Sequence, residues 1–253
     1  MKETTIVEKS KIKKLRKPVM IIGLPGIGLI GQVVGRYMVK ELKAKKIANL
    51  YSPHFPHQVF MTKKGGMRLI KNSFYYFKGK KRDVIILVGD VQALSSQGQY
   101  DVAGKIINYA NKLKVKQIIT IGGYSTGKIS EKRKIFSVTT NKSSRKTLKK
   151  YGAVFGEAKG SIVGAAGLIP ALCNLEKIEG VCLMGETHGG YVDTPAAREI
   201  VKMLSKYLEI KISLKRIDER AKKSEKMLKK IESEIKKSME TGMETSGSVS
   251  YIR

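Results

Sequence analysis

The sequence predicts an α/β protein with a mainly parallel sheet flanked by helices, followed by a helical C-terminal tail of the coiled-coil type. Three observations support this fold class. Short apolar runs recur as far as residue 184, and segments with an apolar residue every three or four positions lie between them. From residue 210 onward the chain has the pattern of one charged helix. Strands that alternate with helices pair in parallel and are covered on both faces.

Seven apolar runs have the length of a strand, and the first follows Pro18 and stops at Gly23. The predicted strands span residues 19–22, 67–70, 74–77, 84–88, 117–121, 135–139 and 181–184. Helical spacing predicts helices over residues 27–42, 103–113, 143–150 and 196–208. A chain of 253 residues can bury such a core without disulfides or a structural metal.

The chain divides into four predicted regions. Residues 1–17 form a basic leader, and residues 18–209 form the α/β domain. Residues 210–238 form an amphipathic helix in which charges are frequent and Gly is absent. Residues 239–253 are rich in Gly, Ser and Thr, which is typical of a flexible tail.

Apolar residues follow heptad spacing along the predicted C-terminal helix, although Ala221 and Ser224 weaken the middle of the seam. The seam consists of Leu214, Ile217, Leu228, Ile231 and Ile235. An apolar seam on a charged helix either pairs with a second helix or lies in a groove. We therefore expect these five residues to form the interface of a homo-oligomer or to pack on a neighbouring protein.

The formal net charge of +29 is the strongest compositional signal, and it is spread over the predicted domain, where residues 18–208 carry +20. Of the 50 basic residues, 40 are Lys and 10 are Arg. Nucleic-acid readers favour Arg, because its planar fork makes bidentate and stacking contacts. A positive surface of this kind also suits an acidic protein partner, and nucleic-acid binding remains the weaker alternative.

Composition also predicts where the protein works. No stretch approaches the ~20 apolar residues that span a bilayer, and residues 1–17 lack the apolar centre of a signal peptide. We therefore expect a cytoplasmic protein without a membrane partner. Cys173 and Cys182 lie in apolar runs, where a buried reduced thiol is the usual occupant.

A glycine-rich turn follows the first predicted strand. Gly26, Gly28 and Gly31 have the spacing of the dinucleotide fingerprint between a strand and a helix. The fingerprint also requires an acid about 20 residues further on, and residues 48–51 contain none. A sharp turn and close helix packing explain the same glycines, and this structural interpretation is favoured over a nucleotide site.

Polar residues stand at the ends of the predicted parallel strands, which share one edge of a sheet. Asp90, Glu186, Thr187 and His188 could form an acid/base cleft there, or they could cap helices and satisfy loop backbone. We favour the second interpretation. No metal-ligand cluster, nucleophile elbow or Walker loop is present in the sequence, so no catalytic residue, cofactor or metal is predicted.

Two stretches together resemble a known family. The first runs from Gly23 through Pro25 to Gly31, and the second is Gly185-Glu186-Thr187-His188-Gly189 followed by Val192-Asp193-x-x-Ala196-Ala197. In this order and separation they are similar to the signature stretches of the proteasome assembly chaperone family, in its archaeal-type members. The resemblance covers residues 12–240.

The resemblance implies a non-catalytic α/β domain with a nucleoside-phosphorylase-like outline that binds proteasome α subunits or the core particle. Some members insert a C-terminal hydrophobic-Tyr-any tripeptide between neighbouring α subunits. Here the chain ends in Tyr251, Ile252 and Arg253, so the aromatic lies one position early. These three residues are the predicted partner-binding end. A nucleotide- or nucleoside-binding enzyme or sensor that uses the Gly26–Gly31 turn is the alternative.

Overall fold

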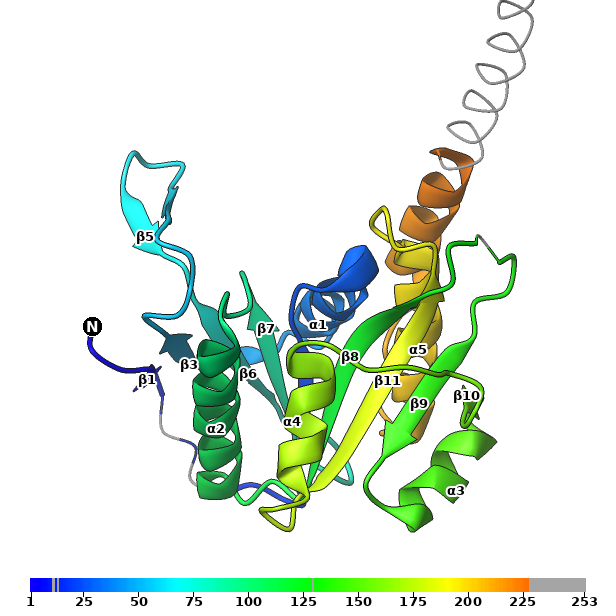
Figure 1. Cartoon of the computed structure of the whole chain (residues 1–253), viewed down its shortest axis with the longest axis horizontal. Helices are drawn as coiled ribbons and strands as arrows, with labels where there is room; N and C mark the ends of the chain where they lie inside the picture. Colours follow the sequence, from blue (N-terminus) through cyan, green and yellow to red (C-terminus); the bar gives the residue numbers. More distant parts are fainter. Residues whose placement is uncertain (11, 13, 129, 228–253) are drawn as a thin grey trace, which may run out of the picture.

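The structure is a computed structural model of the chain, and it describes residues 1–227 except 11, 13 and 129. One large twisted sheet forms its centre (Figure 1). Within the described residues this sheet has nine strands. In spatial order they are β1 (Thr5–Glu8), β3 (Lys45–Tyr51), β6 (Asn72–Phe77), β7 (Val84–Gly89), β2 (Val19–Gly23), β8 (Gln117–Ser125), β11 (Glu179–Thr187), β9 (Ile135–Thr139) and β10 (Ala153–Val154).

Helices cover both faces of the sheet, as expected. They include α1 (Ile30–Glu41), α2 (Ser96–Lys112), α3 (Lys142–Lys150), α4 (Ala165–Cys173) and α5 (Thr194–Tyr207). α1 and α5 pack side by side on one face, whereas α2 and α4 lie together on the other. None of the helices in the described part of the chain is long and apolar enough to cross a membrane.

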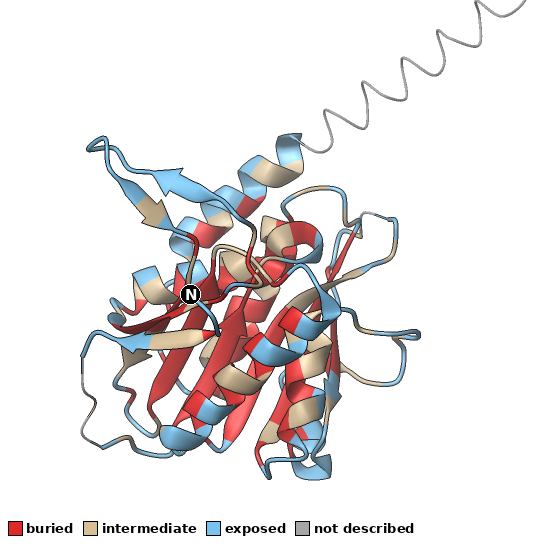
Figure 2. Cartoon of the chain, turned by 60° about the vertical axis from the view of Figure 1, so that its left-hand side comes forward, coloured by how far each residue is buried: buried red, intermediate tan, exposed pale blue. Residues whose placement is uncertain are grey.

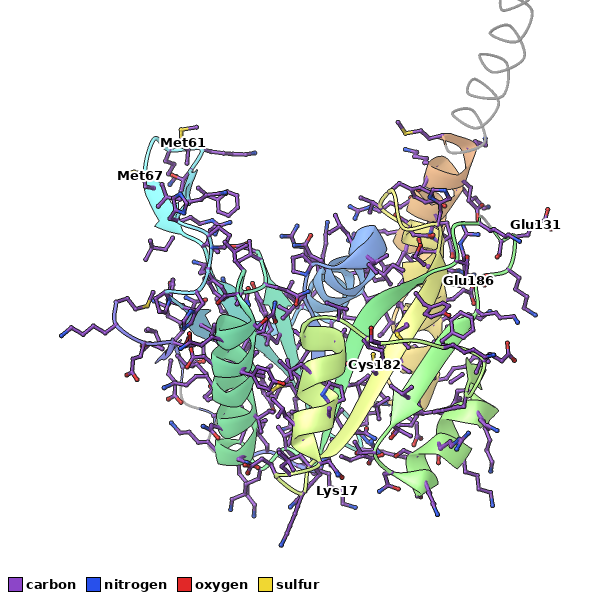
Figure 3. All side chains as sticks on the ribbon, in the orientation of Figure 1. Lys17, Met61, Met67, Glu131, Cys182 and Glu186 are labelled. Atoms are coloured by element: carbon purple, nitrogen blue, oxygen red, sulfur yellow. The ribbon has the colours of Figure 1, made fainter. Side chains whose placement is uncertain are left out.

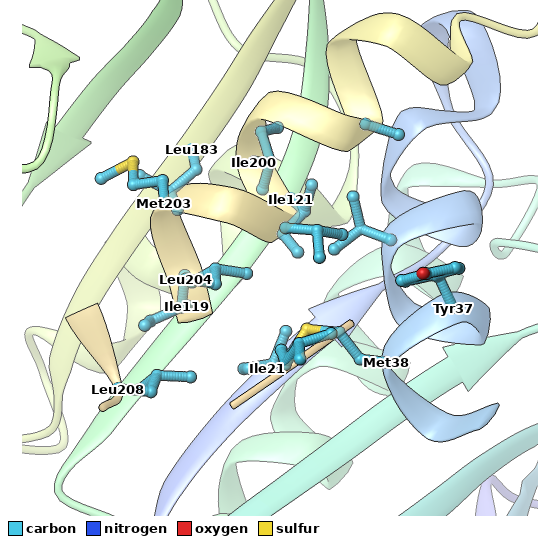
Figure 4. Packing of buried hydrophobic residues seen from close by; sticks show 14 of the residues in the cluster. Ile21, Tyr37, Met38, Ile119, Ile121, Leu183, Ile200, Met203, Leu204 and Leu208 are labelled. Carbon is cyan, nitrogen blue, oxygen red and sulfur yellow. The ribbon is translucent and has the colours of Figure 1, made fainter. Parts of the chain in front are cut away.

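Two apolar cores form because successive strand residues point to opposite faces. Ile21 of β2 packs under α1 and α5, whereas its neighbours Met20 and Ile22 pack under α2 and α4. Figure 4 shows the first of these cores, with Ile21 and Ile119 of the sheet beneath Leu204 of α5. The continuous apolar runs of the central strands reflect this burial on both sides (Figure 2).

The expectation of a mainly parallel sheet is correct for its centre, and the edge strand β10 also pairs parallel with β9, but the other pairs are antiparallel. β7, β2, β8 and β11 are parallel, but β1, β3 and β6 pair antiparallel, and β9 pairs antiparallel with β11. The connection from β6 to β7 covers only residues 78–83. A parallel crossover needs a dozen or more residues, so this connection requires an antiparallel pair. The fold is therefore a mixed α/β sheet flanked by helices.

One edge strand lies in the predicted leader, and one predicted strand forms a separate hairpin. Thr5–Glu8 belongs to the predicted leader, yet it forms the edge strand β1 against β3. The run expected at residues 67–70 does not join the large sheet. It contributes β5 (Met67–Leu69), which pairs with β4 (Val59–Met61) in a separate two-stranded hairpin. This hairpin stands away from the body in Figure 1.

The C-terminal helix begins docked on the body. Residues 215–227 are helical, and Ile217 is fully buried in the core formed with α1 and α5. Tyr37 Oη donates a 2.6 Å hydrogen bond to the carbonyl of Ser213, and Arg198 Nε donates to Asp218 at 2.7 Å. These contacts fix the direction in which the helix leaves the domain.

The first two positions of the predicted oligomer seam contact the domain itself. Ile217 is fully buried and Leu214 is partly buried against the same core, while pairing of the seam with a second copy stays a prediction. The physical reason is that α1 and α5 leave an apolar stripe that this helix covers. Leu228, Ile231 and Ile235 lie outside the described residues.

The fold predicts that both thiols are unreactive in the native protein. Burial raises the pKa of Cys173 to about 12 and that of Cys182 to about 11, so almost no thiolate forms near pH 8.5, the ordinary pKa of a cysteine. A thiol reagent at that pH should label neither residue in the folded protein and both in guanidinium chloride. Rapid labelling of the folded protein would contradict this burial.

Candidate functional site at the carboxyl edge of the sheet

The two signature stretches meet at the carboxyl ends of β2, β8 and β11. The backbone N–H of Asp193 donates a 3.0 Å hydrogen bond to the carbonyl of Gly28, and Ser125 Oγ at the end of β8 donates to the carbonyl of His188 at 2.7 Å. Residues distant in sequence thus form one unit. We call residues 23–31 and 185–197, with the end of β8, the motif junction.

Glycine lets α1 lie directly on the sheet. A Cβ atom on Gly31 would collide with the carbonyl oxygen of Ile121 in β8, and one on Gly23 would collide with the carbonyl oxygen of Gly31. Gly28 has a φ of 62°, in the left-handed region that glycine adopts without strain. Gly23 and Gly31 are therefore required because there is no room for a side chain, and Gly28 is favoured because its backbone has a positive φ.

The junction also engages the middle of the glycine turn, at Gly28. Thr187 is fully buried, and its Oγ would lie 3.1 Å from a Cβ on Gly28. The carbonyl of Gly28 already accepts the hydrogen bond from Asp193. These contacts support the structural interpretation for Gly28 and Gly31, whereas Gly26 lines the neighbouring cavity and has room for a side chain.

A buried ion pair joins the second signature stretch to the loop before β9. Asp193 caps α5 by accepting a 2.9 Å hydrogen bond from the N–H of Ala196, and Arg133 Nε lies 3.3 Å from its other oxygen. Neither side chain is more than 3% exposed. The Nη2 atom of Arg133 is buried without a hydrogen-bond partner among the described residues. The role of Arg133 could not be predicted from the sequence, because no local pattern marks a partner 60 residues away.

The remaining residues of the second stretch hold loops in place. Glu186 accepts hydrogen bonds from Ser130 Oγ at 2.6 Å and from the backbone N–H of Lys134 at 3.0 Å. The ring of His188 is exposed and stacks on Tyr191, with centroids 5.8 Å apart. Figure 3 labels Glu186 at the end of β11. These contacts fit the favoured expectation that the polar strand ends satisfy loop backbone.

Asp90 does not join the motif junction. It follows β7, and β2 and β8 separate that strand from β11 in the sheet. Its carboxylate accepts hydrogen bonds from both terminal nitrogens of Arg68, at 2.6 and 3.4 Å, and one from the backbone N–H of Lys71. The acid/base cleft that we considered from sequence therefore does not assemble from these residues.

A cavity of about 640 Å³ lies beside the junction, on the face covered by α2 and α4. Gly26, Ile121, Ser161, Ala166 and Met184 are among its mainly small and apolar lining residues. None of the described residues that line it is Asp, Glu or His. The described part of the chain also holds no group of three or more His, Cys, Asp or Glu side chains that could bind a metal ion.

Comparison with known proteins places this geometry in a family. A model of the PAC2 family matches residues 20–232, which includes both signature stretches. The chain belongs to the PAC2 family. The expected membership in the proteasome assembly chaperone family is thus confirmed.

Several relatives have the same extent as this PAC2 chain. An uncharacterized protein of Methanocaldococcus jannaschii is 36% identical over 220 residues, which cover 87% of this chain and 85% of the relative. The crystal structure of Pyrococcus furiosus PbaB, described as an archaeal proteasome activator, matches with a TM-score of 0.86 and 38% identity over 92% of this chain and 100% of that chain. Pyrococcus furiosus PbaA, described as an archaeal homologue of proteasome-assembly chaperone, matches in fold, with a TM-score of 0.76 and 24% identity over 98% of this chain and 100% of that chain.

The predicted site residues fall into two groups according to where they lie in the structure. The residues of the two signature stretches are structural parts of the motif junction, and the predicted partner-binding end, Tyr251 to Arg253, lies outside the described residues. In sequence, the predicted tail follows the C-terminal helix that is docked on the PAC2 domain.

Replacing Gly31 by Ala should lower the free energy of unfolding by about 2 kcal/mol, because the new methyl group must push α1 off β8. Gly104 of α2 provides a matched control, since a Cβ atom at this position would meet no other part of the chain within 4 Å. Gly104→Ala should raise the free energy of unfolding by roughly 0.5 to 1 kcal/mol. Urea denaturation would measure both, and equal effects would contradict the close packing of α1.

Replacing Arg133 by Met should destabilise the domain by about 3 to 5 kcal/mol, because the buried carboxylate of Asp193 loses its counter-charge. The double change Arg133→Met, Asp193→Asn should recover much of this loss, since Asn caps a helix without a charge. Thermal unfolding of the three proteins would test the ion pair. A double variant no more stable than Arg133→Met would show that the charge of Asp193 is not the cause.

Proposed function

We propose that this protein is a non-catalytic proteasome-binding protein that acts as an assembly chaperone or activator of the core particle. The observation that carries the proposal is the match to PbaB, which extends over the whole of that chain at 38% identity. PAC2 membership supports the same class of function. The proposal puts the protein in the cytoplasm, together with the proteasome.

The chemistry of the motif junction favours binding over catalysis. Glu186 and Asp193 already accept hydrogen bonds from the protein's own backbone, and Asp193 is also paired with Arg133. A general acid or base must reach its substrate directly or through one water. The cavity beside the junction offers no carboxylate or imidazole for that purpose among its described lining residues.

We assign partner binding in this proposal to the C-terminal end. Tyr251 and Ile252 supply apolar surface, and the terminal carboxylate can pair with a lysine in a pocket between two α subunits. The preceding residues, 239–250, are too polar to fold alone, so they act as a leash. A short leash raises the effective concentration of its tip to about the millimolar range once the body has docked.

Self-association completes the proposed arrangement. Leu228, Ile231 and Ile235 continue the apolar spacing beyond the docked turn of the C-terminal helix. In an oligomer, these residues would join the C-terminal helices of several copies, so that several tails face one ring of α subunits. After the first tail has bound, each further tail would bind within the same complex, which strengthens the overall binding.

Deleting Tyr251–Arg253 should weaken binding to the core particle at least tenfold, which corresponds to about 1.4 kcal/mol, because the tail contact is lost. The exchange Tyr251→Ile, Ile252→Tyr brings the aromatic into the family register and should strengthen binding. Surface plasmon resonance on immobilised core particle would compare both with the full chain. Equal affinities would show that the body alone binds, and no binding of the full chain would overturn the proposed function.

A further inference from the structure

The hairpin formed by β4 and β5 carries an exposed apolar face. Val59, Met61, Met67 and Leu69 are 51%, 90%, 79% and 56% exposed, and we call these four side chains the apolar hairpin face. Figure 3 shows Met61 and Met67 at the outer end of the hairpin, far from the sheet. Single exposed apolar residues are ordinary on a protein surface, whereas contiguous groups mark interaction sites.

The register of the hairpin places these residues on one side. Val59 is opposite Leu69, and Met61 is opposite Met67, while Phe60 is opposite Arg68 between them. Because side chains alternate along a strand, the first two pairs share one face and the third pair occupies the other. One face is therefore entirely apolar.

The other face of the hairpin is anchored to the body. The guanidinium carbon of Arg68 lies 4.2 Å from the ring centre of Phe60, and both terminal nitrogens of Arg68 bond to Asp90. Asp90 is only 14% exposed, and its own N–H is bonded to Asn72 Oδ1 in β6. The bidentate contact fixes orientation as well as position, so the apolar hairpin face is held toward solvent.

The charges around the face indicate its partner. Residues 59–71 contain Lys63, Lys64, Arg68 and Lys71 and no acidic residue. A second copy of this chain, with its net charge of +29, would meet the hairpin with charge of the same sign. A partner with carboxylates around an apolar cleft would match both features. The two methionines suit such a cleft, because their flexible side chains adapt to its shape.

We propose that the apolar hairpin face is a second docking surface, separate from the C-terminal tail, which inserts into an acid-rimmed apolar cleft on the proteasome core particle. This inference rests on the proposed function. The hairpin and the tail leave the domain from different elements, so each adds binding energy without requiring the other to move. The role of Asp90 is to position the hairpin through Arg68.

The double change Met61→Ser, Met67→Ser tests the face without disturbing the fold, since both side chains are largely exposed. The matched control, Val163→Ser, Leu175→Ser, removes two other side chains that are 87% and 77% exposed. Surface plasmon resonance of the full-length proteins on immobilised core particle should show at least a tenfold loss for the hairpin variant and less than a twofold change for the control. Lys63→Glu, Lys64→Glu should slow association and flatten its salt dependence.

Each other outcome overturns the inference in a distinguishable way. If the full chain binds the core particle and the hairpin variant binds equally well, the hairpin is not a docking surface, although the proposed function stands. If the hairpin variant has a smaller mass in light scattering than the full chain, the face pairs two copies instead. If the full chain does not bind the core particle at all, the inference fails together with the proposed function.

Discussion

The close approach of α1 to the carboxyl ends of β2 and β8 is the constraint from which the rest of the structure follows. Without side chains at Gly23 and Gly31, helix and strand backbones touch, and this contact sets where the loop after β11 can run. That loop bonds to the carbonyl of Gly28 and places Asp193 at the start of α5. α1 and α5 then leave the apolar stripe that receives Ile217, so the direction of the C-terminal helix also depends on the glycine contact.

The packing of these loops also explains why the proposed function assigns no catalytic role to the polar residues at the carboxyl edge of the sheet. In open α/β sheets, ligands bind beyond the carboxyl ends of the strands, where loops diverge. Here those loops are bound to one another: Glu186 holds the segment before β9, and Asp90 holds Arg68. Carboxylates engaged in this way stabilise loop positions. In the proposed function, partner binding is therefore assigned to the hairpin and the C-terminal end, which these loops and the docked helix support.

The central strands and the helices α1, α2, α3 and α5 could be predicted from the sequence, because strands buried on both faces have continuous apolar runs and amphipathic helices have three-four spacing. Helix α4 was not predicted. The strand at residues 135–139 was predicted with its observed bounds. The edges could not be predicted in the same way. β1 and β3 begin with polar or charged residues, such as Thr5, Lys45 and Lys46, and gain strand structure only from pairing. Of the candidate site, the two signature stretches were visible, but Arg133 and the Arg68–Asp90 contact depend on tertiary proximity that no local pattern records.

Arginine and lysine have different tasks in this very basic chain. Among the described residues, ion pairs to carboxylates involve five arginines but only three lysines, although lysine is four times as frequent in the sequence. The planar fork of arginine holds a carboxylate in a fixed geometry, as in the pairs that orient the hairpin, α5 and the C-terminal helix. Lysine is a mobile point charge that remains hydrated, so the lysines mainly create a field. A few arginines therefore hold the hairpin, α5 and the C-terminal helix in place. In the proposed function, the lysine-rich surface would attract an acidic partner toward these elements.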